Sequence, residues 1–141
     1  MAKIRVDQMG DILEDELSSY GHDVTETVKQ IVKETAEDCR RDIQNRSPKK
    51  TGRYRRGWRA ETVYDGPAGI LVSVHNKTAP QITHLLENGH SKVGGGRVEG
   101  KAHIRPAEQK AERELVQKLK GALQECRWKS WPPCWRRQDF R

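Results

Sequence analysis

The most informative stretch of the chain is His84-Leu85-Leu86-Glu87-Asn88-Gly89-His90, followed by Gly94-Gly95-Gly96-Arg97 and then His103-Ile104-Arg105-Pro106-Ala107. It gathers three histidines and a carboxylate within 20 residues, which at first suggests a metal site. We interpret it instead as a helical turn over 83–88 ended by Gly89, a long loop over 91–102, and a final helix that begins near Pro106. The glycine triplet, with Arg97 and Lys101, predicts a mobile and cationic loop.

Catalytic and metal-binding patterns do not fit this stretch. His84 and His90 are six residues apart and share no helix face, and Gly89 would end the helix before His90. The sequence has no Gly-x-Ser-x-Gly elbow and no Cys/His nucleophile pattern. The full Gly-x-x-x-x-Gly-Lys-Ser/Thr motif of a phosphate loop is missing, and no buried strand precedes the glycine triplet. We therefore predict no catalytic residue, no metal and no cofactor. An enzyme would instead show stoichiometric zinc, manganese or magnesium, or hydrolytic activity.

The composition indicates one polar domain with an incomplete core. Of the 141 residues, 33% are hydrophobic and 33% are charged, with a mean hydropathy of −0.97, against about 25% charged residues in typical globular chains. We expect parts of the chain to be unstructured and burial to be completed by partner subunits. The predicted organisation is a single α+β domain over 1–127 and a Trp/Pro/Arg-rich tail over 128–141, which either docks on another surface or frays.

The cysteine pattern and the hydropathy of the chain indicate the cellular compartment in which the protein is expected. Cys39, Cys126 and Cys134 match no zinc-binding spacing. The chain also shows no secretory signal and no apolar run near 18 residues. We expect thiols in a reducing cytoplasm, with Cys39 as a small core residue because it lies on an apolar helix stripe.

A long amphipathic helix is predicted over 23–46. Asp23 can cap it, Glu26 completes a capping box, and Pro48 follows its end. Its apolar face recurs in steps of three and four: Val24, Val28, Ile31, Val32, Thr35, Cys39 and Ile43. Such a helix would be roughly 35 Å long. A shorter helix is predicted over 4–17, interrupted by Gly10 and ended by the Ser18–Gly21 segment.

Two strands and a last helix complete the predicted fold. Residues 58–64 alternate with Trp58, Ala60, Thr62 and Tyr64 on one face, and 70–75 form a second strand after a Gly/Pro turn. This hairpin needs a helix or another strand against it to be stable. Apolar spacing from Ala107 to Leu123 predicts a second amphipathic helix to about residue 127.

A basic run precedes the hairpin and suggests a polyanionic neighbour. The net charge is +7, and six cations interleave with Tyr54 and Trp58: Lys49, Lys50, Arg53, Arg55, Arg56 and Arg59. Arginine with aromatic residues can grip phosphates and stack on bases. If all six met duplex DNA, log K would fall with log salt at a slope of about −5. A solvated basic edge, or a surface for an acidic partner, is the alternative.

In this order of elements the sequence resembles the head–tail joining (neck, tail-completion) proteins of long-tailed siphophages, over roughly residues 23–125. The resemblance lies in the long helix, Thr51-Gly52-Arg53 with its basic and aromatic run, the hairpin, and the stretch from Leu85 to Ala107. It implies an α+β fold, with the long helix against a small antiparallel sheet, and no catalysis.

The resemblance also implies a place in the virion, at the head–tail junction, after a period in the host cytoplasm. The chain would form a homo-oligomeric ring, hexameric, or dodecameric if closer to the portal, between adjacent head-closure or adaptor and tail rings. Double-stranded DNA would pass through its lumen without sequence-specific contacts. The alternative function is a sequence-independent nucleic-acid-binding protein.

Site residues follow from this interpretation. The basic run Lys49–Arg59 would face DNA or an acidic ring. The loop with Gly94, Gly95, Gly96, Arg97 and Lys101 would contact a neighbouring subunit or ring. The turn with Glu87, Gly89 and His90 would position that loop, with Glu87 anchoring a nearby arginine and the histidines packing or hydrogen bonding.

Overall fold

One long helix organises the chain. The computed structural model describes residues 9–49, 52–67 and 69–129, and its first element is α1, Met9–Arg46, of 38 residues or roughly 57 Å. The predicted break at Gly10 and the predicted end at Ser18–Gly21 are both wrong, because glycine and serine lower helix stability by only about 1 kcal/mol or less. Asp23 is therefore not a cap: its carbonyl accepts a bond from Thr27 Oγ1 at 2.8 Å inside the helix. The part of the predicted first helix before Met9 lies outside the described residues.

The predicted β-hairpin is present and packs against α1. Strands β1, Trp58–Gly66, and β2, Gly69–Asn76, pair antiparallel, from Trp58 opposite Asn76 to Gly66 opposite Gly69. A bulge between Thr62 and Tyr64 shifts the register. Tyr64 consequently pairs with the exposed Leu71, so its predicted place on the face of Trp58 is wrong.

Short elements cluster where α1 ends. They are α2 (Arg53–Arg56), which was not predicted, the 3-10 turn η2 (Pro80–Ile82), and α3 (Thr83–Asn88), the predicted helical turn. Residues after α3 form a second hairpin, β3 (Gly89–Ser91) with β4 (Arg97–Glu99). The predicted long loop is therefore wrong over these residues, because Gly95 and Gly96 take the left-handed conformation (φ 90° and 89°) that a tight turn needs.

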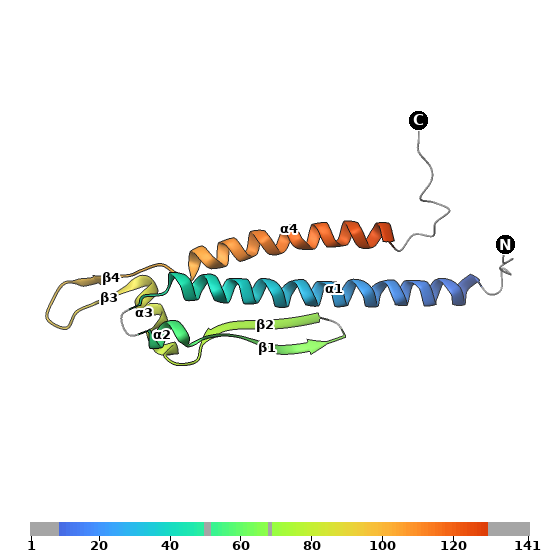
Figure 1. Ribbon diagram of the computed structural model, residues 1–141. Helices are drawn as coiled ribbons and strands as arrows, with labels where there is room; N and C mark the ends of the chain where they lie inside the picture. The colour runs from blue at the N-terminus through green and yellow to red at the C-terminus, as the bar shows by residue number, and fades with distance from the viewer. Residues whose placement is uncertain (1–8, 50–51, 68, 130–141) are drawn as a thin grey trace, which may run out of the picture.

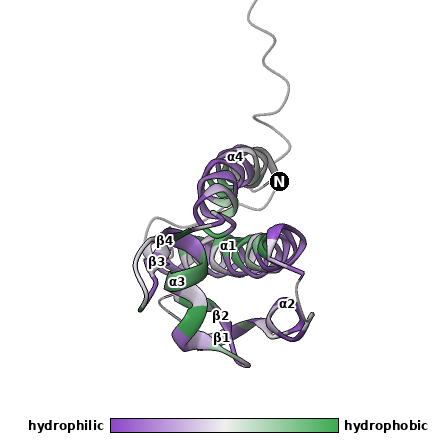
Figure 2. Cartoon of the chain, turned by 90° about the vertical axis from the view of Figure 1, so that its left-hand side faces the viewer, coloured by the Kyte–Doolittle hydropathy of each residue, from purple (hydrophilic) through white to green (hydrophobic). Residues whose placement is uncertain are grey.

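The last helix completes a three-layer arrangement. Helix α4, Arg105–Lys129, lies along one side of α1 and the β1–β2 hairpin along the other (Figures 1 and 2). Ion pairs join α4 to α1 between Lys110 and Asp42 (2.7 Å) and between Lys118 and Asp38 (3.3 Å). The helix runs through residues 128–129 of the predicted tail, and 130–141 lie outside the described residues.

The core is small and lies at one end of the molecule. Its buried hydrophobic residues are Ile43, Tyr54, Trp58 and Ala107, with Cys39, Val74, Ala79, Leu86 and Ile104 partly buried against them. The predicted α+β class, with the long helix on an antiparallel hairpin, is confirmed. Cys39 lies at the edge of the core as a half-buried thiol.

Candidate functional site

The carboxylate of Glu87 holds the start of α4. Its Oε2 accepts hydrogen bonds from the backbone N–H groups of His103 (2.8 Å) and Ile104 (3.0 Å), and its Oε1 accepts one from Arg105 (3.0 Å). N–H groups at the start of a helix have no partner within that helix, and a negative charge there is favourable. Glu87 therefore caps α4 from another element. We expected Glu87 to anchor a nearby arginine, and its bond to Arg105 is made by the backbone N–H of that residue.

These bonds set the ionisation of Glu87. Burial by itself favours the protonated form, but the three backbone N–H groups and the neighbouring His103 outweigh it, so the pKa of Glu87 lies below its usual value. The carboxylate is consequently ionised near neutral pH and acts as a fixed negative cap between α3 and α4.

His103 continues the network into the core. Its side chain is fully buried, with Nδ1 at 2.7 Å from the Lys101 carbonyl and Nε2 at 2.8 Å from the Tyr54 hydroxyl. A carbonyl can only accept, so Nδ1 carries a hydrogen and donates it to the Lys101 carbonyl. Burial raises the pKa of Tyr54, so its hydroxyl stays protonated beside Nε2. His103 thus has the hydrogen-bonding role that was predicted for it.

Further buried polar groups tie β1 and β2 to the end of α1. Trp58 Nε1 donates to Ser47 Oγ (3.0 Å), which donates to the Ile43 carbonyl (2.6 Å). Asn76 Nδ2 donates to the Tyr54 carbonyl (2.8 Å). We call the residues Ser47, Tyr54, Trp58, Asn76, Glu87 and His103 the polar hub. Sequence reasoning missed Ser47 and Asn76. The indole of Trp58 was the available signal, since a buried Trp N–H needs an acceptor.

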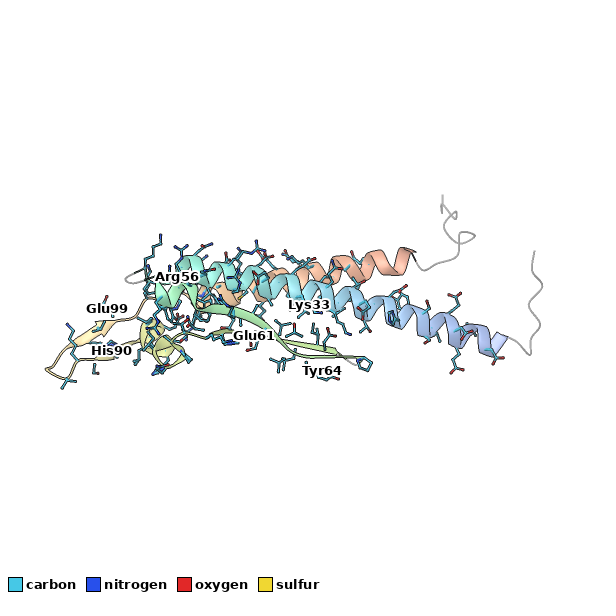
Figure 3. All side chains as sticks on the ribbon, turned by 60° about the horizontal axis from the view of Figure 1, so that its bottom comes forward. Lys33, Arg56, Glu61, Tyr64, His90 and Glu99 are labelled. Carbon is cyan, nitrogen blue, oxygen red and sulfur yellow. The ribbon has the colours of Figure 1, made fainter. Side chains whose placement is uncertain are left out.

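The basic run divides into structural and exposed cations. Arg55 donates to the Gln44 carbonyl (3.0 Å) and to Asn45 Oδ1 (3.2 Å), so it stabilises the C-terminal end of α1. Arg59 donates to the carbonyls of Arg56 and Trp58. Lys49, Arg53 and Arg56 are exposed at this end of the molecule, where Figure 3 labels Arg56, and Lys50 lies outside the described residues.

The aromatic residues of the basic run are not available for base stacking. Tyr54 is 7% exposed and Trp58 is 2% exposed, and the two rings meet edge to face at 5.8 Å. The predicted combination of arginine and aromatic side chains on a nucleic acid is therefore wrong. Any contact with DNA would rest on the exposed cations alone.

The β3–β4 hairpin projects from the same end (Figure 1). Gly89 begins it with φ 78°, so close to Val98 and Gly100 that a Cβ would collide with their backbone. Arg97 Nη2 donates to the Asn88 carbonyl at 3.1 Å, and the Lys101 N–H donates to the Leu86 carbonyl at 2.7 Å. The predicted turn and loop residues thus lie together, with Val93 fully exposed at the tip.

The histidines do not converge. His84 and His90 are exposed, whereas His103 is buried in the hub. Within residues 9–49, 52–67 and 69–129, no three His, Cys, Asp or Glu side chains are grouped to hold a metal ion. Across the same part of the chain, none of the helices has the length and apolar character that a membrane span requires.

The model of the HK97-gp10-like family, described as "Bacteriophage HK97-gp10, putative tail-component", matches residues 11–89, which is more than half of the chain. The chain belongs to this family of bacteriophage tail components. No curated protein and no solved structure gives a significant match. The family match covers α1 to α3 and ends where the β3–β4 hairpin begins.

Proposed function

We propose that the chain is a head–tail joining protein that connects the DNA-filled head to the tail. In this role it forms a homo-oligomeric ring, hexameric, or dodecameric if it lies closer to the portal. It contacts the head-closure or adaptor ring on one side and the tail ring on the other. It reaches this junction of the virion from the host cytoplasm and has no catalytic role. Residues 1–127 act as one domain, with 128–141 as an added tail.

The observation that supports this proposal most directly is that this member of a phage tail-component family leaves many large apolar side chains exposed. Within the described residues, large apolar side chains stay exposed on three projecting parts: Leu13, Leu17 and Tyr20 on α1, Val63, Tyr64 and Leu71 on the β1–β2 hairpin, and Val93 on the β3–β4 hairpin. Exposed apolar groups of this kind mark contact surfaces. Neighbouring subunits and rings would cover them.

The β3–β4 hairpin is the proposed contact with an adjacent ring. Its short ladder and its two left-handed glycines make it a shaped projection rather than a free loop. Val93 gives the tip an apolar contact, and Arg97 and Lys101 keep the base cationic. Glu87, Gly89 and His90 lie where the hairpin leaves α3, so they set its direction.

The exposed cations Lys49, Arg53 and Arg56 form the proposed surface toward the DNA lumen or an acidic ring. If these three met duplex DNA, log K would fall with log salt at a slope of about −2.7. Such binding is weak and independent of sequence, which suits DNA that must pass through during ejection. Arg55 and Arg59 hold the local fold and contribute less.

Genetic complementation tests the proposal. A phage lacking this chain should accumulate DNA-filled heads and separate tails, and adding purified chain should join them into infectious particles. Val93→Ser should leave the fold unchanged and lower the yield of joined particles, whereas Gln81→Ser, at an exposed residue outside the proposed contacts, serves as the control. Joined particles formed at the normal rate without the chain would overturn the proposal.

The second candidate function is a sequence-independent nucleic-acid-binding protein, which the net charge of +7 favours. The isolated chain would then hold DNA at physiological salt with a slope well beyond −2.7. The exchange Arg53→Gln with Arg56→Gln would abolish that binding, whereas Arg41→Gln, on an exposed face of α1, would not.

A further inference from the structure

Within residues 9–49, 52–67 and 69–129, no other segment of the chain covers the start of α1. We call residues 10–23 the N-terminal arm. Its described side chains are all exposed, and Figure 1 shows the beginning of α1 extending past the ends of α4 and of the β1–β2 hairpin. Because α1 is one continuous helix, the arm cannot fold back onto its own α4.

The arm nevertheless carries an apolar stripe. Leu13, Leu17 and Tyr20 are 56%, 68% and 37% exposed, and their spacing of four and three places them on one helix face. The same stripe continues through Val24 and Val28, which are half-buried where the rest of the chain begins to cover α1. The arm therefore extends a packing surface beyond the part of α1 that the other described residues cover.

Acidic residues flank this stripe. The arm contains Asp11, Glu14, Asp15, Glu16 and Asp23 and has no lysine or arginine. By helical spacing, Glu14 lies on one side of the apolar stripe and Glu16 on the other. A partner surface must therefore be apolar along its centre and basic at its edges.

Helix α4 presents such a surface on its outer face. Val116 (44% exposed) and Leu123 (43% exposed) are seven residues apart and lie on one face with the exposed Arg113 and Lys120. This face is opposite the one that contains the buried Ala107 and packs on α1. The positive charge of this face is opposite to the negative charge of the arm.

The same combination of apolar contacts flanked by ion pairs is present between α1 and α4 of one chain. Where α4 lies on α1, Lys110 and Lys118 of α4 pair with Asp42 and Asp38 of α1 beside the apolar contact. The exposed tip of the β1–β2 hairpin offers the arm a different environment, since its Tyr64 lies between the carboxylates Glu61 and Asp65 in sequence (Figure 3 labels Glu61 and Tyr64). Like charges would repel there.

We propose that the N-terminal arm of one subunit packs on the outer face of α4 in a second copy of the chain. Leu13, Leu17 and Tyr20 then contact Val116 and Leu123, and Glu14 and Glu16 face Arg113 and Lys120. The contact joins two different surfaces of the chain, the arm and the outer face of α4. It can therefore repeat head to tail from copy to copy, and such a heterologous contact closes into a ring when the rotation permits. The inference rests on the proposed function for its ring but concerns an interface that can be tested separately.

A charge exchange tests the interface in the purified full-length chain. Glu14→Lys with Glu16→Lys, or Arg113→Glu with Lys120→Glu, should each weaken self-association at least about tenfold in sedimentation velocity, because like charges then meet. Mixing the two variants should restore association, since each supplies the complement of the other. Asp11→Lys with Asp15→Lys makes the same charge change on the opposite face of the arm and should leave association unchanged.

Three results would overturn the proposal: a chain that stays monomeric at all concentrations, a mixture that does not recover, or a control that weakens association equally. Circular dichroism of each variant should show unchanged helix content, because all the substituted side chains are exposed.

Photo-cross-linking identifies directly which surface the N-terminal arm contacts. A photoreactive amino acid at Leu17 should cross-link to the α4 peptide containing Val116 of a second copy, both in the purified chain and in completed particles. A cross-link to the β1–β2 hairpin or to another virion protein would contradict the inference while leaving the head–tail role intact. Absence of the chain from particles, with the charge exchange still working, would defeat only the proposed function.

Discussion

The two ends of α1 differ in what surrounds them. At its C-terminal end, side chains from α2, β1, β2 and α3 meet Ser47, which follows α1, and His103, which precedes α4. In this polar hub, donors and acceptors pair with one another. At its N-terminal end, the arm is a single exposed helix with an apolar stripe between carboxylates. The fold is therefore stabilised at the C-terminal end of α1, whereas the described side chains at its N-terminal end remain exposed.

Removing the largest side chain of the hub should have the largest effect. Trp58→Ala deletes a side chain that is 2% exposed and its bond to Ser47, and should lower the free energy of unfolding by about 3–5 kcal/mol. Leu17→Ala in the arm is the matched change and should shift it by less than about 0.5 kcal/mol. Urea unfolding of both variants measures the two free energies of unfolding. Equal losses in the two variants would show that the hub does not stabilise the fold more than the arm does.

The cap on α4 should give a smaller, pH-dependent effect. Glu87→Gln replaces a carboxylate that accepts three backbone bonds, so it should cost about 1–3 kcal/mol near neutral pH. The pKa of Glu87 is lowered in the folded chain. Its stabilisation is therefore present above the unfolded value of about 4.3 and is lost as pH falls through the folded value.

Unfolding at a series of pH values checks this sign. The wild-type chain and Glu87→Gln should converge in stability as the solution is acidified below about pH 4.3. Glu99→Gln, at an exposed carboxylate of β4, is the control. A difference between wild type and Glu87→Gln that stays constant down to low pH would refute the charged cap.

The long helices and the β1–β2 hairpin of the fold could be predicted from the sequence, but the contacts of the polar hub could not. The apolar spacing of α1 and the alternation of β1 and β2 are local patterns, so the helix and the hairpin were predictable from them. The cap by Glu87 joins residues 16–18 positions apart, and Ser47 meets Trp58 only after α2 reverses the chain. Contacts between residues so far apart in the sequence cannot be predicted from local periodicity.

Two local predictions failed for physical reasons. Gly10 and the Ser18–Gly21 segment looked like helix boundaries, yet a helix without proline can continue through them at small cost. The glycine triplet looked like a free loop, but two of its members supply the left-handed turn of the β3–β4 hairpin. The family likeness was predictable, although its match covers 11–89 rather than the stretch from Leu85 to Ala107 that had seemed more specific.

The glycine triplet allows a sharper comparison within the projecting hairpin. Gly95→Ala places a Cβ on a backbone with φ 90° and should cost about 1–2 kcal/mol locally. Gly94→Ala, one residue earlier, has open space and no positive φ, and should be neutral. Amide hydrogen exchange of β3 and β4 should rise in the first variant only. Equal exchange in both variants would mean that the turn does not hold the hairpin.

The smallest effect is expected where the tip of the β1–β2 hairpin meets α1. Hydrogen bonds and charge from Lys33 and Lys29 (Nζ to carboxylate 2.8 and 2.9 Å) lower the pKa of Asp65 to about 2. Lys29→Gln with Lys33→Gln should return this pKa toward about 3.9 with little change in thermal stability. An NMR titration of the Asp65 carboxyl measures it, and a pKa that stays near 2 in the double variant would show another cause.

The head–tail joining role is tested most directly by cryo-electron microscopy of completed particles. We predict a symmetric ring of this chain at the head–tail junction, with Lys49, Arg53 and Arg56 toward the DNA channel or an acidic neighbouring ring and each N-terminal arm on the next subunit. A chain located elsewhere in the virion, or absent from it, would contradict the head–tail joining role.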